Sequence, residues 1–396
     1  MLKKNHLFWF PLLLVFYELP TYLSNDAYLP ALPIIVKDFL TTPHLVQLTL
    51  TAWFLGTAFM QLVLGPLADR YGRRLILLSG GIVFIISTIG CALAPNIWFL
   101  LTMRVIQGLT VTSMIVAGYA TIHDLFDHDK AIHTLAWMYS ISVLAPSAGP
   151  LLGAVVLYFA GWREIFWILA LWAFIVIVGL WKQMPETAPK IPGSIHPVKI
   201  MREYKRMLFN FQYISPTLSF CLLFSTMIAW LSAGPFLVIT AFHRSAFTFG
   251  LLQCFVFGGY IAGTRLIKLI LKKYKTSHLL NLGLIVAFAG GGCALLLAWL
   301  RPQALIALVL SVMLIAISMG FCSPMLNRAA VEAAPDESMG NRIALYSCLT
   351  SLFGMLSSAL ITGIYNGRSL PLAFVLFAST LLALALNFLK QRGFKK

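Results

Sequence analysis

The chain has 396 residues, of which 60% are hydrophobic and 11% are charged, and its mean hydropathy is +0.87. A soluble domain carries about 45–50% apolar and about 25% charged residues, so this composition excludes a soluble globular protein and indicates a polytopic membrane protein. The formal net charge of +16 is spread in short clusters between apolar runs, as membrane topology predicts. We therefore expect no nucleic-acid partner.

Twelve apolar segments predict an all-α polytopic membrane protein, because a helix needs about 20 apolar residues to cross the hydrocarbon core. The first segment follows Lys3 and Lys4 but has no small-residue cleavage site, so we interpret it as an uncleaved span and not as a signal peptide. The predicted spans are residues 8–33, 46–68, 75–94, 98–121, 132–157, 164–184, 213–240, 247–271, 278–299, 303–330, 342–365 and 370–390.

A polar, basic and proline-broken stretch separates the sixth span from the seventh. It predicts a cytoplasmic linker at residues 185–212, between an N-terminal six-helix bundle at 1–184 and a C-terminal six-helix bundle at 213–396. Two six-span halves are typical of transporters whose site lies between the halves near the midplane. Residue identity between the halves is faint.

The distribution of lysine and arginine predicts the orientation of the chain. Most of the 29 basic residues fall on the segments that lie on the side of the two termini. The opposite side holds Lys37, Arg163, Arg244, Arg301 and Arg368. We therefore expect both termini to be cytoplasmic.

Two carboxylates, Glu18 and Asp26, interrupt the first apolar run. An ionisable side chain at membrane depth costs about 2.5–3.5 kcal/mol on insertion scales and indicates a functional residue. If the span enters the membrane near Trp9 and Pro11, Glu18 lies about 10–14 Å deep and Asp26 about 22–26 Å deep in a core about 30 Å thick. We predict two separate acidic positions on one helix, with Glu18 nearer the middle.

The sequence GPLADRYGRR follows the second predicted span. Gly65 and Gly72 allow a tight, close-packed turn. We expect Asp69 to lie near the start of the next helix, where a carboxylate complements the helix dipole, and Arg70 and Arg73 to anchor the turn at the cytoplasmic interface. A generic basic loop is the alternative.

Arg104 lies inside the fourth predicted span, in the sequence RVIQG. An intramembrane arginine either pairs inside the helix bundle or extends toward the interface, and Arg104 is about 9 Å from the outer end of its helix. We expect it to face inward and to donate hydrogen bonds to an acid or to the backbone of the first span. We expect its acidic partner to be Asp26.

The fifth predicted span contains the sequence APSAGPLLG. Small residues let helices approach closely in lipid, and prolines bend them. We predict that Pro146, Gly149, Pro150 and Gly153 provide the packing and bending that a moving interface requires.

The remaining charged residues, and the histidines and cysteines, say less about function than the motifs above. Asp124, Asp127 and Asp129 follow the fourth span and predict a solvated cytoplasmic face, and of the three Asp124 is expected to lie close to the bundle. Arg265 in the eighth span is either a second intramembrane arginine or an extension of the lysine cluster that starts at Lys268. The histidines and cysteines show no metal-ligand spacing, and no catalytic constellation is present, so we expect no enzyme, metal or cofactor.

Three sequences together, GPLADRYGRR, RVIQG and APSAGPLLG, resemble the drug/proton antiporter branch of the major facilitator superfamily. The run from Pro11 to Pro33, PLLLVFYELPTYLSNDAYLPALP, is similar to the first span of MdfA-type multidrug efflux transporters, and its DAYLPALP part to the related Bcr/CflA group. The resemblance covers nearly the whole chain and is densest in the first half. It implies the major facilitator fold, with 12 transmembrane helices in two six-helix halves.

The resemblance also implies roles for matching positions. Glu18 and Asp26 fall where the family keeps its two acids for proton and drug coupling, and Arg104 matches its conformationally coupled arginine. Asp124 stands where the family often has a glutamate, whereas Pro20 departs from the pattern. The positions that match the lining of the drug cavity are Tyr22, Asn25, Gln107, Tyr119, Ser142, Val143, Met227 and Leu231.

The function that the resemblance implies is a proton-coupled multidrug efflux antiporter in the bacterial inner membrane, exporting lipophilic cationic and neutral, chloramphenicol-like drugs by alternating access. Its partners would be drugs, protons and the lipid bilayer, and it would be monomeric and driven by the proton gradient without a cofactor. The alternative is a proton-coupled symporter for a specific nutrient. Uptake of a sugar would require more polar side chains than these mostly aliphatic and aromatic spans offer.

Overall fold

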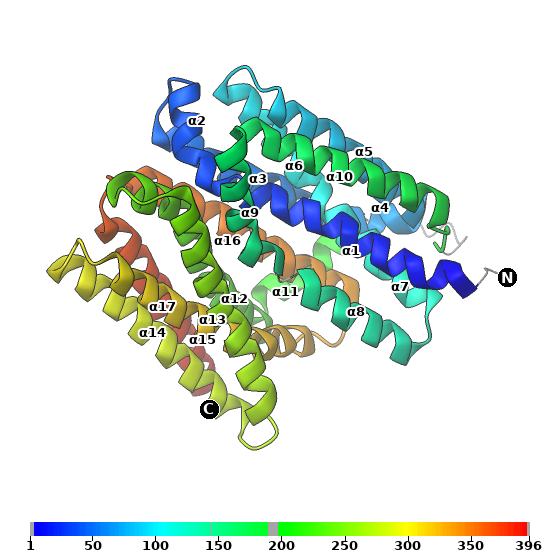
Figure 1. Cartoon of the computed structure of the whole chain (residues 1–396). Helices are drawn as coiled ribbons and strands as arrows, with labels where there is room; N and C mark the ends of the chain where they lie inside the picture. Colours follow the sequence, from blue (N-terminus) through cyan, green and yellow to red (C-terminus); the bar gives the residue numbers. More distant parts are fainter. Residues whose placement is uncertain (1–3, 143, 189–196, 394–396) are drawn as a thin grey trace. The chain divides into compact units, whose positions relative to one another are not determined.

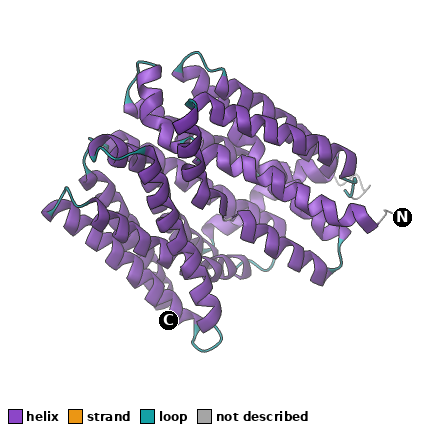
Figure 2. Cartoon of the chain, in the orientation of Figure 1, coloured by secondary structure: helices purple, strands orange, loops and turns teal. Residues whose placement is uncertain are grey.

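The computed structural model describes residues 4–142, 144–188 and 197–393, and these residues form helices joined by turns and loops (Figures 1 and 2). The chain separates into two compact units. Unit 1 comprises Met1–Thr41 and Ala52–His196, and unit 2 comprises Thr42–Thr51 and Pro197–Lys396. Helix α3 (Pro43–Gln61) therefore begins in unit 2 and ends in unit 1.

Unit 1 holds the end of α3 and the elements that carry the intramembrane charges. These are α1 (Lys4–Asp26), the 3₁₀ turn η1 (Leu29–Ala31), α2 (Leu32–Asp38), α4 (Leu64–Tyr71), α5 (Arg73–Ala92), α6 (Ile97–Ser113), the π-helix η2 (Met114–Gly118), α7 (Tyr119–Leu125), α8 (His128–Ser142), α9 (Leu144–Phe159) and α10 (Trp162–Gln183).

Unit 2 holds the start of α3 and the remaining helices. These are α11 (Pro197–Phe209), α12 (Phe211–Pro235), the π-helix η3 (Phe236–Ala241), α13 (Ala246–Ile270), α14 (Thr276–Leu300), α15 (Leu305–Glu332), α16 (Met339–Ile364) and α17 (Ser369–Gly393).

Within the described residues, nine helical segments are long and apolar enough to cross a membrane. The other three predicted spans are also helical: 8–33 is covered by α1 with η1 and the start of α2, 46–68 by α3 and α4, and 132–157 by α8 and α9. These segments are shorter or less hydrophobic than the other nine. Helix α1 carries Glu18, Asn25 and Asp26 in its second half, and α9 has only 16 residues.

Local sequence sets several helix starts. The side chain of Asn96 accepts a hydrogen bond from the Phe99 amide (2.9 Å) at the start of α6, and that of Ser245 accepts one from the Thr248 amide (3.1 Å) at the start of α13. Each cap satisfies a backbone donor that has no partner within its own helix. These helices therefore begin where the sequence supplies a side-chain oxygen.

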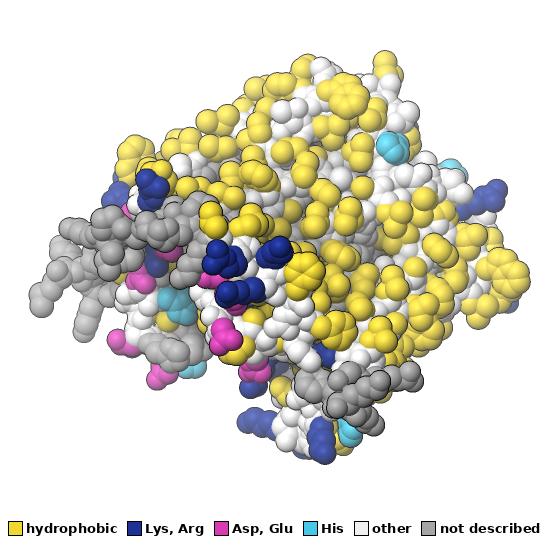
Figure 3. Space-filling view, turned by 180° about the vertical axis from the view of Figure 1, so that it is seen from behind, with side chains coloured by type: hydrophobic (Ala, Val, Ile, Leu, Met, Phe, Trp, Pro, Cys, Tyr) yellow, Lys and Arg dark blue, Asp and Glu magenta, His cyan; other side chains and the backbone are white. Residues whose placement is uncertain are grey.

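Helix α10 shows how the spans distribute apolar residues. Its buried side includes Phe166 and Ala173, whereas Leu171 and Ile175 on the other side are more than half exposed. Hydrophobic side chains likewise cover most of the face drawn in Figure 3, and charged side chains gather in separate clusters. Such extensive apolar exposure is unfavourable in water and is expected of a surface that faces lipid.

A polar brace joins α2 to the start of α10 in unit 1. Arg163 forms an ion pair with Asp38, and Trp162 Nε1 donates a hydrogen bond to Asp38 Oδ2 (3.0 Å). The Arg163 guanidinium, followed by the indole N–H, holds the pKa of Asp38 below its usual range. Both charged side chains are more than a third exposed, so solvent screens the pair and its contribution to stability is small.

We expect Asp38→Asn to lower the stability of the protein by at most about 1 kcal/mol near neutral pH, because it removes a screened ion pair. A carboxyl whose pKa is lowered by folding stabilises the protein above its unfolded pKa, about 3.9, and loses that effect as the pH falls through its folded pKa. The difference in melting temperature between parent and Asp38→Asn should therefore shrink below about pH 4. A difference that grows in acid would contradict the assignment.

Candidate functional site

The backbone of helix α1 is irregular between the two acids, Glu18 and Asp26. Pro20 lies inside the helix and has no N–H, so one backbone hydrogen bond is missing there. Nearby hydroxyls supply local bonds: Thr21 Oγ1 donates to the Glu18 carbonyl (2.6 Å), and Ser24 Oγ donates to the Thr21 carbonyl (2.7 Å). At 3.6 residues per turn, the eight positions from Glu18 to Asp26 correspond to a rotation of about 80°. The two acids therefore have different surroundings.

Glu18 is buried, with 1% of its surface exposed, and contacts a tyrosine from another helix. Tyr119 Oη donates a hydrogen bond of 2.7 Å to Glu18 Oε1. Tyr119 is the first residue of α7 and follows the π-helix η2 directly. A π-helical turn is wider than an α-turn and changes which way the following side chains point, and such turns occur frequently at functional sites.

Asp26, at 4% exposure, ends α1 and lies in a different polar group. Its Oδ1 accepts a hydrogen bond from Asn25 Nδ2 (3.3 Å), and Asn25 Oδ1 accepts one from Arg104 Nη2 (3.3 Å). Asn25 thus links the carboxylate to the guanidinium. The predicted partnership of Arg104 with Asp26 is therefore found only as an indirect link through Asn25.

Arg104 is fully buried in α6, at 0% exposure. Its Nη1 donates to the Ser24 carbonyl (2.8 Å) and to Gln107 Oε1 (2.5 Å), and its guanidinium lies over the Tyr28 ring, 4.4 Å from the centroid. The prediction that Arg104 faces inward and donates to the backbone of the first span is confirmed, and the alternative that it extends toward the interface is wrong.

Two partners in this network, Thr88 and Tyr28, were not predicted from the sequence. Thr88 Oγ1 on α5 accepts a hydrogen bond from Gln107 Nε2 (2.8 Å), and the Tyr28 ring covers the guanidinium of Arg104. Tyr28 lies in the same short stretch as the acids, so its aromatic ring could have been named as a cation–π partner. Thr88 gave no signal, because a lone threonine in an apolar run is common.

Small residues of α9 let this helix approach the end of α1. A Cβ built on Gly153 would lie 1.6 Å from the Ala27 carbonyl oxygen, and one on Gly149 would lie 2.8 Å from Asp26 Cβ. Pro146 lies in the first turn of α9 and Pro150 inside the helix. The predicted packing role of the glycines is confirmed, and the contact positions the acidic end of α1.

The turn between α4 and α5 is also organised by a long-range contact. Gly72 has φ +104°, a conformation that L side chains rarely adopt, and a Cβ there would lie 2.4 Å from Glu186 Oε2, so glycine is strongly favoured. Glu186 accepts backbone N–H bonds from Arg73 (2.9 Å) and Arg74 (3.2 Å) at the N-terminus of α5. The carboxylate that complements the dipole of α5 is therefore Glu186, just after the sixth span.

The prediction for Asp69 was wrong, because α4 continues to Tyr71 and places Asp69 in its last turn, before the start of α5. Arg73 lies 3.9 Å from Asp69, forms an ion pair with Asp124, and donates to the Ala120 carbonyl (2.8 Å). Asp124 thus contacts the helix bundle, as its position suggested.

Gly65 and Arg70, also predicted to shape this turn, are less tightly packed than Gly72 and Arg73. Gly65 lies within α4, and a Cβ there would meet no described atom within 4 Å, so the close packing expected at Gly65 is not found. Arg70 is exposed and lies over the Tyr71 ring, 5.4 Å from the centroid.

The structure places the remaining predicted residues on several helices, and one of them falls outside the described part. Tyr22 is half-buried on α1; Ser142 ends α8, although its side chain is not described, and Val143 lies outside the described residues. Met227 and Leu231 are buried in α12 of unit 2. Arg265 is exposed on α13.

We expect Gly153→Ala to lower the free energy of unfolding by about 1–3 kcal/mol, because the added methyl group overlaps the Ala27 backbone and α9 must move away from α1. Gly292→Ala is the matched control: it also lies inside a helix, and its Cβ would meet no described atom within 4 Å. The control should leave the melting temperature unchanged or slightly higher. Equal losses in both variants would contradict the close approach.

Arg104→Lys should lower the free energy of unfolding by about 1–3 kcal/mol, because a single ammonium cannot reproduce the forked contacts to Ser24, Gln107 and Asn25 and leaves buried acceptors unsatisfied. Arg163→Lys, at a partly exposed arginine, should cost at most about 1 kcal/mol. Melting curves in detergent measure both. If Arg104→Lys and Arg163→Lys lower the free energy of unfolding equally, the hydrogen bonds of Arg104 do not contribute as proposed.

Comparison with known proteins identifies the family. Residues 14–358 match the Major Facilitator Superfamily. Multidrug transporter MdfA of Escherichia coli O6:H1 is 33% identical over 274 residues, which cover 69% of this chain and 67% of that protein. Multidrug resistance protein MdtM of Salmonella typhimurium is 28% identical over 320 residues, covering 81% of this chain and 78% of MdtM.

Solved structures agree at the level of the fold. A bacterial homolog of the human lysosomal transporter Spinster, inward-facing and unoccupied, has a TM-score of 0.75 at 16% identity and covers 98% of both chains. A D-xylose–proton symporter has a TM-score of 0.71 at 14% identity, covering 94% of this chain and 96% of its own. The family match, the multidrug transporter relatives and the shared fold agree. This chain therefore belongs to the Major Facilitator Superfamily of membrane transporters.

Proposed function

We propose that this protein is a proton-coupled multidrug efflux antiporter of the bacterial inner membrane, with both termini in the cytoplasm, that exports lipophilic cationic and neutral drugs. The observation that carries the proposal is the burial of two carboxyl groups, Glu18 and Asp26, on one helix beside a fully buried Arg104. The relatives named as multidrug transporters support the drug class. The positions of lysine and arginine support the orientation.

The two acids suit different tasks. Burial in a low-dielectric cavity favours the protonated form of a carboxyl group, whereas a nearby cation favours the charged form. Glu18 accepts a hydrogen bond from the Tyr119 hydroxyl, and Asp26 is linked through Asn25 to the Arg104 guanidinium. We assign the proton that a cationic drug displaces to Glu18, the buried acid that lies nearer the middle of the predicted span.

Asp26 and Arg104 are suited to couple the state of the site to conformation. Arg104 contacts the Ser24 carbonyl as well as Asn25, so a change of charge at Asp26 can be transmitted to the end of α1 and to α6. Neutral drugs would act through this route, since they cannot replace a proton by charge. Drug and proton would then occupy the transporter in alternation, and the proton gradient would drive export.

Proton release on drug binding tests the proposal. Adding tetraphenylphosphonium to the weakly buffered, purified full-length protein should release protons, which a pH-indicator dye reports. Glu18→Gln and Asp26→Asn should each reduce the release, and the double variant should lower it to background, because an amide carries no titratable proton. Asp129→Asn, at an exposed carboxylate on α8, is the matched control and should behave like the parent.

Two outcomes would overturn the proposal. Release from the double variant that equals that of the parent would remove both acids from the coupling mechanism. Proton movement triggered by sugars or amino acids, and not by tetraphenylphosphonium or chloramphenicol, would replace drug efflux with nutrient uptake.

A further inference from the structure

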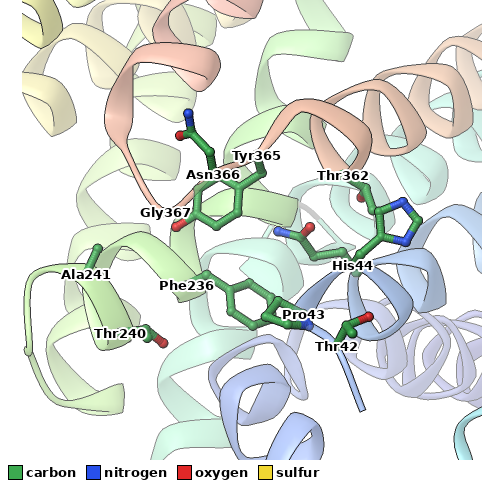
Figure 4. A pocket seen from close by; sticks show the side chains of 11 residues that line it. Thr42, Pro43, His44, Phe236, Thr240, Ala241, Thr362, Tyr365, Asn366 and Gly367 are labelled. Carbon is green, nitrogen blue, oxygen red and sulfur yellow. The ribbon is translucent and has the colours of Figure 1, made fainter.

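Unit 2 contains a cavity of about 400 Å³, formed where three segments meet. The segments are the start of α3, the π-helix η3 and the end of α16 with the residues that follow it (Figure 4). A volume of 300–1,000 Å³ is typical of small-molecule sites. The lining residues are Thr42, Pro43, His44, Gln47, Phe236, Thr240, Ala241, Thr362, Tyr365, Asn366 and Gly367.

The cavity has a buried floor and an exposed rim. Gln47, Phe236 and Thr362 are each at most 3% exposed, and Tyr365 is half-buried. The rings of Phe236 and Tyr365 lie 6.3 Å apart at an angle of 50° and form an aromatic wall (Figure 4). The other lining residues are exposed. A flat apolar group can therefore reach the aromatic wall from outside.

One polar group of the floor is left without a protein partner. The side chain of Gln47 donates to the Ser232 carbonyl (3.1 Å), and on the rim Thr42 Oγ1 accepts from the Leu45 amide (3.4 Å). Thr362 Oγ1, by contrast, is buried and has no hydrogen-bond partner in the described part of the chain. A buried hydroxyl without a partner is costly, and a ligand with a donor or an acceptor would satisfy it.

The charge of the cavity selects the class of ligand. None of the eleven described lining residues is Asp, Glu, Lys or Arg. The wall segment η3 is a π-helix, a rare conformation that occurs frequently at functional sites. We propose that this cavity is a second small-molecule site, whose lining does not include the acids Glu18 and Asp26, and that it binds an uncharged aromatic compound that hydrogen-bonds to Thr362. The site does not depend on proton coupling or on the direction of transport.

Protection of an introduced cysteine tests the site directly. Thr240 lies on the exposed rim, so Thr240→Cys in the full-length protein should react with N-ethylmaleimide, and mass spectrometry of that peptide gives the rate. Chloramphenicol is the probe, because it is an uncharged nitroaromatic with hydroxyl and amide groups. Raised to its solubility limit, it should slow the alkylation of Thr240→Cys several-fold. It should leave the rate at Gln303→Cys, an exposed position in another turn outside the cavity, unchanged.

A second variant ties the protection to the floor of the cavity. In the Thr240→Cys background, Thr362→Val should raise the half-protecting concentration of chloramphenicol by about 2–10-fold, the effect of one neutral hydrogen bond. Thr380→Val removes a buried hydroxyl that donates to the carbonyls of Leu376 and Phe377 on α17 and does not line the cavity, and it should not change this concentration. Tetraphenylphosphonium should protect neither cysteine, since the lining offers no carboxylate.

Three results would overturn the second site: no protection of Thr240→Cys, equal protection of Gln303→Cys, or equal effects of Thr362→Val and Thr380→Val. The assay needs neither drug transport nor proton release. Its failure is therefore distinguishable from a failure of the proposed antiport function.

Discussion

A guanidinium and two carboxyl groups have to be satisfied without bulk water in unit 1, and this constraint organises the site. An isolated charge at membrane depth is unfavourable, so each ionisable group needs partners that the helices themselves supply. Arg104 meets this requirement with a backbone carbonyl, two amide side chains and the ring of Tyr28. The polar residues of α1 thus belong to two buried groups, one with Glu18 and Tyr119 and the other with Asp26, Asn25 and Arg104.

Close helix packing makes that network possible. Gly149 and Gly153 allow α9 to approach Asp26 and Ala27, and Gly108 lets α6 approach α3, where an added Cβ would lie 2.1 Å from the Trp53 carbonyl oxygen. In lipid, where water does not drive helices together, such small residues are a main source of association. Packing and chemistry are coupled here, since the same contact that holds two helices together fixes the position of a carboxylate.

The two units present contrasting polar environments. The groups around Glu18 and around Asp26 with Arg104 contain ionisable residues buried within unit 1, whereas the cavity beside Phe236 and Tyr365 in unit 2 has no Asp, Glu, Lys or Arg in its lining and is open at its rim. The Glu18 group and the cavity each lie next to a π-helix, η2 before Tyr119 and η3 along the cavity wall. A wide turn redirects side chains within an otherwise regular span, and in this chain it does so twice where polar groups meet aromatic rings.

Sequence alone determined the features that depend on local composition. The apolar runs, the basic clusters, the acids of α1, the position of Arg104 inside a span and the small-residue pattern of α9 could all be read within windows of about 20 residues, because the hydrocarbon core imposes that length on each span. Only the tertiary structure decided which partners meet. Tyr119 reaches Glu18 across 101 positions, and Glu186 reaches the start of α5 across 113, displacing Asp69 from the role assigned to it. Such contacts depend on how helices pack, and the periodicity of a single helix carries no record of its distant neighbours.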